Sequence, residues 1–288
     1  LWLPWAKKHI KKLDDEIEQQ LGRISPRQID RRLKDRKVAL GRRIYGRTKP
    51  GTLLKHHIPI KTDNWDVDAP GFAEIDLVSH SGNNASGEFI HSLNLTDIHT
   101  TWVETKAVMG KGQTGIVAAI DQMQKSMPFT LCGIDSDNGS EFINHHLYKY
   151  CQDCNIQFTR GRPYKKDDNA HIEQKNWTHV RKLLGWDRYD SAKALNAIND
   201  LYRNEMRLMM NLFQPSVKLK SKTRIGSRIK RHYDEPQTPL DRARASRNIE
   251  PDKLAALLAL REKTDPFKLA RTIERKLLRV HKLAKLNR

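Results

Sequence analysis

Cysteine and long apolar runs are both scarce in this sequence of 288 residues. Three cysteines, an odd number, argue against a disulfide framework and favour a reducing compartment, so we expect a cytoplasmic protein. No stretch approaches the about 18 consecutive apolar residues of a membrane span, and no signal peptide is visible. Because the chain begins at Leu1 rather than Met, we expect a fragment or a trimmed product.

Acidic residues are the minority among the charges, with 34 Asp and Glu against 53 Lys and Arg and a formal net charge of +19. The excess of positive charge is uneven along the chain. Residues 1–60 hold 16 Lys and Arg against 6 Asp and Glu, residues 214–250 hold 10 against 4, and residues 66–190 hold 12 against 17. A solvated cationic surface is one explanation. An acidic middle between basic flanks instead favours a metal-dependent centre whose neighbours bind a polyanion.

Three acidic residues stand out in the acidic middle because of their surroundings. Asp76 lies in Glu-Ile-Asp-Leu-Val, inside the strand-like run 72–79. Asp137 lies in Ser-Asp-Asn-Gly-Ser-Glu-Phe, where an Asn-Gly turn follows the strand-like run 129–135. Glu173 lies in Ala-His-Ile-Glu-Gln-Lys-Asn within a predicted helix, and 35 residues separate it from Asp137.

Carboxylates in apolar strands are costly unless something compensates their charge. Two or three of them brought together repel one another, and a divalent cation is the usual relief. Hard oxygen ligands without thiolates indicate Mg²⁺ or Mn²⁺ rather than zinc, and two such ions suit in-line displacement at phosphorus. Each acid also has a structural alternative. Asp76 could be a core residue whose charge is satisfied, and Glu173 could be an exposed helix residue. Asp137 could be a turn residue, and Asp135 competes with it for the catalytic role.

At these residues and spacings the chain resembles the superfamily of DDE transposases and retroviral-type integrases, and most closely a bacterial insertion-sequence transposase. The resemblance covers about residues 66–190. It implies a metal-dependent enzyme that cleaves DNA ends and joins them by attack of a DNA 3′-hydroxyl on a target phosphodiester during transposition. It further implies two Mg²⁺ or Mn²⁺ ions, with Asp76 contacting both, Asp137 one and Glu173 the other.

The same resemblance implies partners and a location. The partners are double-stranded DNA, as element ends and target, and further copies of the chain in a homo-oligomer. The location is the bacterial cytoplasm, with the nucleoid when DNA is bound. Retroviral integrases carry a His-His-Cys-Cys zinc domain at the amino end, and this chain has no cysteine before Cys132, so that domain is not expected.

The pattern of elements predicts an α/β fold: a ribonuclease H-like mixed sheet with flanking helices, preceded by a small helical domain and followed by a small basic β element and helices. Strand-like runs and helical periodicities alternate in the middle of the chain. The predicted strands cover 72–79, 88–96, 101–108, 129–135 and 156–159, and the predicted helices cover 116–127, 141–154, the segment around Glu173 and 191–213. The predicted domains are 1–40, a basic linker at 41–65, the catalytic domain at 66–213 and a carboxy-terminal part at 214–288.

Residues 1–40 are expected to form a helix-turn-helix DNA-binding domain. Residues 1–24 are predicted to be helical, and Ser25 and Pro26 suit the start of a second, basic helix. A pair of amphipathic helices with a solvated basic face is the alternative. The apolar residues expected to face inward are Leu13, Ile17, Leu21, Ile24, Ile29 and Leu33, and the cations expected to contact DNA are Arg27, Arg31 and Arg32.

Further cations are candidates for DNA contacts. In the segment before Glu173 they are Arg162, Lys165 and Lys166, with a solvated loop as the alternative, and in the following helix they are Lys175 and Arg181. Residues 217–233 alternate basic and apolar residues and predict a small β element lying on DNA, whereas the basic amphipathic helices of 251–288 fit DNA or another subunit. The pair Cys151 and Cys154 resembles a zinc motif only weakly, and packing is the preferred interpretation.

Two other functions compete with the transposase. A non-catalytic, domesticated DNA-binding protein would keep the basic flanks, but the intact acidic triad argues against it. A ribonuclease H-like nuclease would cut without strand transfer, and the basic segments at both ends favour recognition of specific DNA ends instead.

Overall fold

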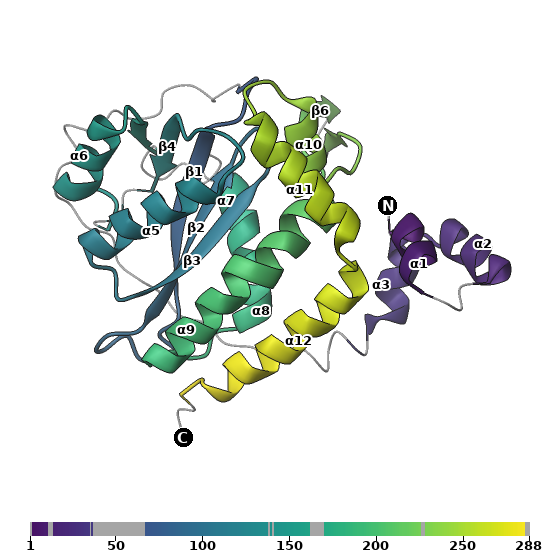
Figure 1. Ribbon diagram of the computed structural model, residues 1–288, viewed down its shortest axis with the longest axis horizontal. Helices are drawn as coiled ribbons and strands as arrows, with labels where there is room; N and C mark the ends of the chain where they lie inside the picture. The colour runs from purple at the N-terminus through teal and green to yellow at the C-terminus, as the bar shows by residue number, and fades with distance from the viewer. Residues whose placement is uncertain are drawn as a thin grey trace.

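The computed structural model describes residues 2–10, 14–34, 36, 67–137, 139, 141–161, 170–225 and 228–285. A five-stranded sheet forms the centre of this part of the chain (Figure 1). Its strand order is β3-β2-β1-β4-β5. The pairs β3–β2 and β2–β1 are antiparallel, whereas β1–β4 and β4–β5 are parallel. This is the predicted ribonuclease H-like mixed sheet. The strands are β1 (Phe72–Ser79), β2 (Ile90–Asp97), β3 (Val103–Met109), β4 (Gly133–Ser136) and β5 (Gln157–Arg160).

Helices flank the sheet, as predicted. Helix α5 (Gln113–Ser126) packs against β2, β3 and α6 (His145–Asp153), whereas α7 (Ala170–Lys175) packs against β1 and β2. A π-helical stretch, η2, continues α7 directly. The remaining segments of this part are η2 (Asn176–Arg181), α8 (Lys182–Leu184), α9 (Ala192–Leu201), η3 (Tyr202–Met206) and η4 (Met209–Phe213).

Two elements begin four residues later than predicted, at Gly133 instead of 129 and at His145 instead of 141. The predicted strand 129–135 begins only at Gly133, because Phe129 and Leu131 are buried by packing without joining the sheet. The predicted helix 141–154 begins only at His145, since the Asn144 side chain caps it by accepting a hydrogen bond from the backbone N–H of Leu147 at 2.9 Å. Residues at these boundaries therefore lie in turns beside the sheet.

Two asparagine side chains cover the outer edge of β3. The Asn199 amide accepts a hydrogen bond from the Ala107 N–H and donates one to the Ala107 carbonyl, both at 2.9 Å. Asn211 does the same at Val103, with distances of 2.9 and 2.8 Å. These amides satisfy backbone groups that a neighbouring strand would otherwise pair.

The three amino-terminal helices reach the rest of the molecule through α1 (Leu3–His9). The Trp5 ring lies edge-on to Phe213 with a centroid distance of 5.1 Å, and Trp2 is similarly placed 5.8 Å from Phe267. The Lys8 ammonium pairs with Glu262 at 3.1 Å. Figure 1 shows these helices beside the carboxy-terminal helix α12 (Pro266–Lys282).

The following helices, α2 (Asp15–Arg23) and α3 (Pro26–Arg32), correct part of the prediction. Ser25 caps α3 in a reciprocal capping box with Gln28, as its position indicated. Of the side chains expected to face inward, Ile24 is half-buried and four others are exposed, because α1 makes the amino-terminal contacts with the rest of the molecule. Their exposed fractions are 42% for Ile17, 46% for Leu21, 41% for Ile29 and 40% for Leu33, and Leu13 lies outside the described residues.

The carboxy-terminal part contains the predicted basic β element and helices. A hairpin of β6 (Leu219–Ile225) and β7 (Arg228–Tyr233) is followed by α10 (Pro239–Ala245), which was not predicted, and by α11 (Pro251–Lys263) and α12. The helices that the structure describes include none with the length and apolarity that crossing a lipid bilayer requires. The predicted linker 41–65 lies outside the described residues.

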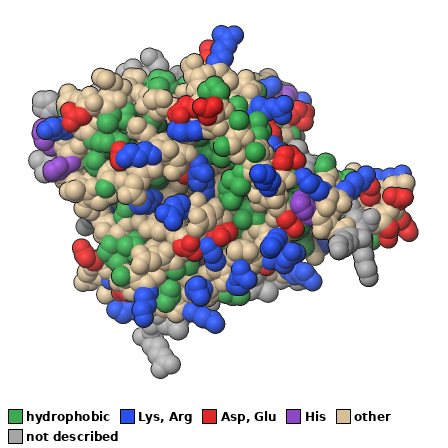
Figure 2. All heavy atoms as spheres, viewed as in Figure 1, with side chains coloured by type: hydrophobic (Ala, Val, Ile, Leu, Met, Phe, Trp, Pro, Cys, Tyr) green, Lys and Arg blue, Asp and Glu red, His purple; other side chains and the backbone are tan. Residues whose placement is uncertain are grey.

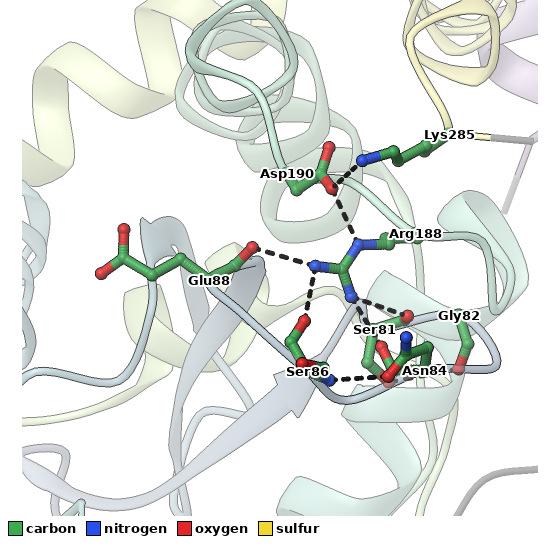
Figure 3. A network of polar contacts seen from close by, with 8 residues as sticks. All are labelled: Ser81, Gly82, Asn84, Ser86, Glu88, Arg188, Asp190 and Lys285. Carbon is green, nitrogen blue, oxygen red and sulfur yellow. Dashed lines mark hydrogen bonds and ion pairs between the residues drawn. The ribbon is translucent and has the colours of Figure 1, made fainter.

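Arg188 joins three segments that are remote along the chain (Figure 3). Its guanidinium donates hydrogen bonds to the carbonyls of Asn84 at 2.6 Å and Ser86 at 2.9 Å, in the connection between β1 and β2. It also donates to the Asp190 carboxylate at 2.8 Å, and its own carbonyl accepts from the backbone N–H of Lys285. The loop after β1 is thereby fixed against the chain beyond α8 and against the end of α12.

Candidate active site

Asp76 lies in the middle of β1, opposite Asn94 of β2. Both oxygens of its carboxylate accept hydrogen bonds. The backbone N–H of Leu77 donates to one at 2.7 Å, and the Asn176 amide, from the helix that carries Glu173, donates to the other at 2.5 Å. The carboxylate is thus held between its own strand and the helix packed on the sheet.

A chain of side-chain hydrogen bonds orients the Asn176 amide. The Thr105 hydroxyl donates to the Asn94 carbonyl oxygen at 2.7 Å, and the Asn94 amide donates to the Asn176 carbonyl oxygen at 2.5 Å. The Asn176 NH₂ group is therefore directed at Asp76. Side chains from β3, β2 and the α7–η2 helix position one carboxylate in β1.

Asp137 follows β4 directly, and β4 runs parallel to β1. The backbone N–H of Gly139 donates to its carboxylate at 2.9 Å. A Cβ atom at Gly139 would lie 2.9 Å from an Asp137 carboxylate oxygen and 2.8 Å from Cδ of Glu141. Because Gly139 has no Cβ atom, the carboxylates of Asp137 and Glu141 can both occupy the space beside it.

Burial and neighbouring negative charge raise the pKa of both Asp76 and Asp137. Burial, and next the charge of Asp137, raise the pKa of Asp76 to about 7, and the charge of Glu141 adds to this shift. Burial first, then the charge of Glu141, raises the pKa of Asp137, whereas the nearby Lys111 lowers it. The Lys111 ammonium lies 3.7 Å from the Glu141 carboxylate. Two carboxyl groups that are 61 positions apart in sequence are thus electrostatically coupled in the fold.

Asp135, which competed with Asp137 for the catalytic role, lies elsewhere in the structure. Its side chain is fully buried and accepts a hydrogen bond from the Thr159 hydroxyl of β5 at 2.6 Å. This contact gives Asp135 a structural role between β4 and β5. Of the two, Asp137 is the one whose charge acts on Asp76.

Glu173 is exposed on α7, one helical turn before Asn176. Its helix therefore lies over Asp76, but in the part of the chain that the structure describes, no three Asp, Glu, His or Cys side chains are placed to hold a metal ion. The structure brings Asp76, Asp137 and Glu141 into one electrostatic cluster and leaves Glu173 outside it. Sequence reasoning did not select Glu141, and its only signal was that it is the third acid within seven residues.

The cations proposed to bind DNA lie in different settings. Arg27, Arg31 and Arg32 are exposed on or at the end of α3, while Arg162, Lys165 and Lys166 lie outside the described residues. Lys175 is only 7% exposed, and burial, with the charge of Arg242, lowers its pKa to about 8. The Arg181 guanidinium lies 3.9 Å from the centre of the Trp186 ring, and burial lowers its pKa to about 10. The α7–η2 helix thus turns the Lys175 side chain into the protein, and its contact with DNA stays a prediction.

Cys151 and Cys154 are both free thiols. Cys151 is buried in the core under α6, and burial raises the pKa of its thiol to about 12, whereas Cys154 is exposed at the end of that helix. The packing interpretation of Cys151 agrees with this placement.

Comparison with known proteins identifies one relative by sequence. The chain is 37% identical over 242 residues to the uncharacterized protein y4rM of Sinorhizobium fredii. The matched region covers 83% of this chain and 69% of y4rM. The chain therefore belongs to the same protein family as y4rM. No model of a described protein family matches it.

Comparison of the fold with solved structures finds similarity to retroviral integrases. The catalytic core of bovine immunodeficiency virus integrase, 16% identical, covers 59% of this chain and 91% of that core with a TM-score of 0.38. The HTLV-2 integrase core in complex with magnesium, 14% identical, covers 51% and 91% with a TM-score of 0.38. The simian T-cell lymphotropic virus intasome with a PP2A regulatory subunit, 14% identical, covers 63% and 70% with a TM-score of 0.41.

Proposed function

We propose that this protein is a DDE-type polynucleotidyl transferase that cleaves the ends of a DNA element and joins them to target DNA. The observation that carries this proposal is the coupling of Asp76, in β1, with Asp137, directly after the neighbouring parallel strand β4. Burial and next the charge of Asp137 raise the pKa of Asp76 to about 7. Buried, mutually repelling carboxylates with raised pKa values are typical of functional rather than structural acids.

The donor set fits a divalent cation of the magnesium type. Asp76 and Asp137 supply hard oxygen atoms, and a cation between them would remove the repulsion that now raises the pKa of Asp76. Glu173, exposed on the helix over Asp76, would complete the ligands. Bound cations would supply an activated nucleophile and stabilise the leaving oxygen.

The chain's own residues have separate tasks in this proposal. Asn176, oriented through Asn94, holds the Asp76 carboxylate in one orientation. Gly139 fixes Asp137 through its backbone N–H and keeps the space beside it free of a side chain. No covalent intermediate with the protein is needed, since water serves as nucleophile in cleavage and a DNA 3′-hydroxyl in joining.

The basic segments would hold the DNA. The hairpin β6–β7 contains no acidic residue and carries exposed cations together with the exposed side chains of Ile229 and Tyr233. The cations of α3 form a second basic surface, and in this proposal the amino-terminal helices recognise the ends of the element.

A joining assay with a pool of DNA ends tests the proposal. Duplexes with recessed 3′-hydroxyl ends of randomised sequence are incubated with a supercoiled plasmid, Mg²⁺ or Mn²⁺ and the whole chain, and joined products are sequenced. We expect joined products from the wild-type protein that enrich one end sequence. Asp137→Asn should lower joining by at least about 100-fold, since even groups behind metal ligands contribute about 10–100-fold.

The matched control is Asp121→Asn, which removes an exposed carboxylate paired with Lys125 on α5 and should join DNA like the wild type. Nicked plasmid without joined products would identify a nuclease instead. DNA binding without nicking or joining in the wild-type protein would identify a non-catalytic DNA-binding protein, and either result overturns the proposal.

A further inference from the structure

The last helix, α12, presents two faces of opposite character. Leu269, Ile273 and Val280 are buried, and the helix packs against α8, α9, η3 and η4. Lys276 belongs to this inner side, because its ammonium pairs with Asp200 and Glu205, each at 2.6 Å. The apolar face of α12 is therefore already occupied by the protein itself.

The outer face of α12 carries a row of cations, which we call the α12 stripe. At 100° per residue its members fall within an arc of about 80°, and from first to last they span about 21 Å along the helix. The space-filling view shows Lys and Arg side chains gathered along the course of α12 (Figure 2). The stripe consists of the exposed residues Lys268, Arg271, Arg275, Arg279 and Lys282.

The cations of the α12 stripe form no close ion pairs within the described part of the chain, although the charge of Arg271 acts at longer range on Asp265 at the start of this helix. None of its five cations lies within 4.0 Å of a described carboxylate, and Glu274, the exposed acid of this helix, is turned away from the centre of the arc. Like charges aligned at such spacing repel one another and destabilise a helix slightly. Binding of a polyanion would relieve this repulsion.

We infer that the α12 stripe binds the phosphate backbone of double-stranded DNA. Duplex DNA carries one negative charge per about 1.7 Å of its axis, so a stripe of about 21 Å can meet several phosphates. A second copy of the chain is disfavoured, because five aligned cations would repel their counterparts in a symmetric contact. A membrane surface is disfavoured as well, because an interfacial helix inserts an apolar face into lipid, and α12 has only Leu278, 64% exposed, among its outer cations.

The choice of DNA as the polyanion rests on the proposed function. Binding is therefore measured separately from chemistry, by fluorescence anisotropy of a labelled duplex of random sequence in EDTA, over a series of NaCl concentrations. In the triple variant Arg271→Gln, Arg275→Gln and Arg279→Gln, we expect the Kd to rise about tenfold or more. The slope of log affinity against log salt should become shallower by about 2–3, since each lost phosphate contact removes about 0.9.

Two controls separate the stripe from net charge and from the helix itself. Lys125→Gln, Lys149→Gln and Lys193→Gln together remove the same charge from exposed positions on α5, α6 and α9. Lys276→Gln removes a cation from the inner side of α12, where it is paired with two carboxylates. Both controls should keep nearly the wild-type affinity and salt slope, and thermal unfolding should show that the triple α12 variant is folded.

Equal Kd values and slopes for the triple α12 variant and the three-lysine control would overturn the inference. So would an α12 variant that loses binding to vesicles of phosphatidylserine and phosphatidylcholine while keeping its affinity for the duplex. The duplex-binding assay contains no divalent cation, so it measures DNA binding separately from the proposed chemistry. If the protein does not join DNA but the triple α12 variant still binds the duplex more weakly than the wild type, the proposed chemistry is overturned. The inferred DNA binding by the α12 stripe is then unaffected.

Discussion

At the scale of single residues, the titration of the Asp76 carboxyl group is the property on which the proposed chemistry depends. Its pKa of about 7 follows mainly from burial and next from the charge of Asp137. The folded protein thus holds the Asp76 proton more tightly than the unfolded chain does. The resulting stabilisation is complete below the ordinary pKa near 4 and is lost as the pH rises through about 7.

Replacing Asp137 should change the titration of Asp76 in a defined way. In Asp137→Asn we expect the pKa of Asp76 to fall below about 7 but to stay above 3.8, because burial, the larger cause, remains. The measurement is a carboxyl ¹³C NMR titration without divalent cations. Glu141→Gln should give a smaller decrease, since the charge of Glu141 is the least of the causes. An unchanged Asp76 pKa in Asp137→Asn contradicts the coupling of the two acids.

At the scale of elements, the turn between β4 and α6 decides where the site carboxylates lie. Gly139→Ala should lower the free energy of unfolding by about 1–3 kcal/mol, because the new methyl group overlaps with Asp137 and Glu141 in a packed place. Gly115→Ala in α5 is the opposite case. Its Cβ meets nothing within 4 Å, so alanine should raise the free energy of unfolding by up to about 1 kcal/mol.

Urea unfolding of the two alanine variants checks these opposite signs. A Gly139→Ala protein as stable as the wild type would show that the Asp137 and Glu141 side chains move aside without cost. Their convergence over the glycine would then have no role in fixing the site.

The elements of the central sheet were predictable from sequence, and the reason lies in their side chains. The run Ala73-Glu74-Ile75 to Val78 combines apolar residues with a clear start and end, and β1 has the predicted bounds. Asp137 was selected over Asp135 because it directly precedes Asn-Gly, as in the motif of the superfamily that the chain resembles. In both cases the local sequence alone contains the information.

Other features depend on contacts that no local pattern encodes. Helical periodicity showed which side of α2 and α3 is apolar, but it does not show whether another element covers that side, so the inward orientation of Ile29 was wrong. The Asn176 amide and the Glu141 carboxylate belong to the candidate site only because separate elements meet there. Lys175 shares its helix with Glu173, yet the turn of the helix buries it.

At the scale of the whole molecule, Arg188 connects segments about a hundred positions apart. Its guanidinium is the common donor for carbonyls of the β1–β2 connection and for Asp190, which also binds Lys285 (Figure 3). The backbone carbonyl of Arg188 accepts a hydrogen bond from the backbone N–H of Lys285, which follows α12. One side chain thus holds the sheet, the region after α8 and the carboxy-terminal part together.

Arg188→Ala should therefore destabilise the whole chain. We expect a loss of about 3 kcal/mol, because the hydrogen bonds from a charged donor to the carbonyls of Asn84 and Ser86 and to Asp190 disappear. Arg188→Lys should recover only part of this, since an ammonium cannot reproduce the planar fork. Calorimetric unfolding checks the order of the three proteins, with Arg244→Ala, an exposed arginine of α10, as the matched control. Equal midpoints for Arg188→Ala and Arg244→Ala contradict this role.

The amides of Asn199 and Asn211 have a consequence for how copies of this chain can meet. An extended polypeptide that approaches β3 finds the donors and acceptors of Val103 and Ala107 already engaged. Growth of the sheet by addition of a foreign strand is therefore blocked at these two positions. The helical segments beside β3 thus prevent a further strand from pairing at these positions, and they do so through hydrogen bonds from side-chain amides.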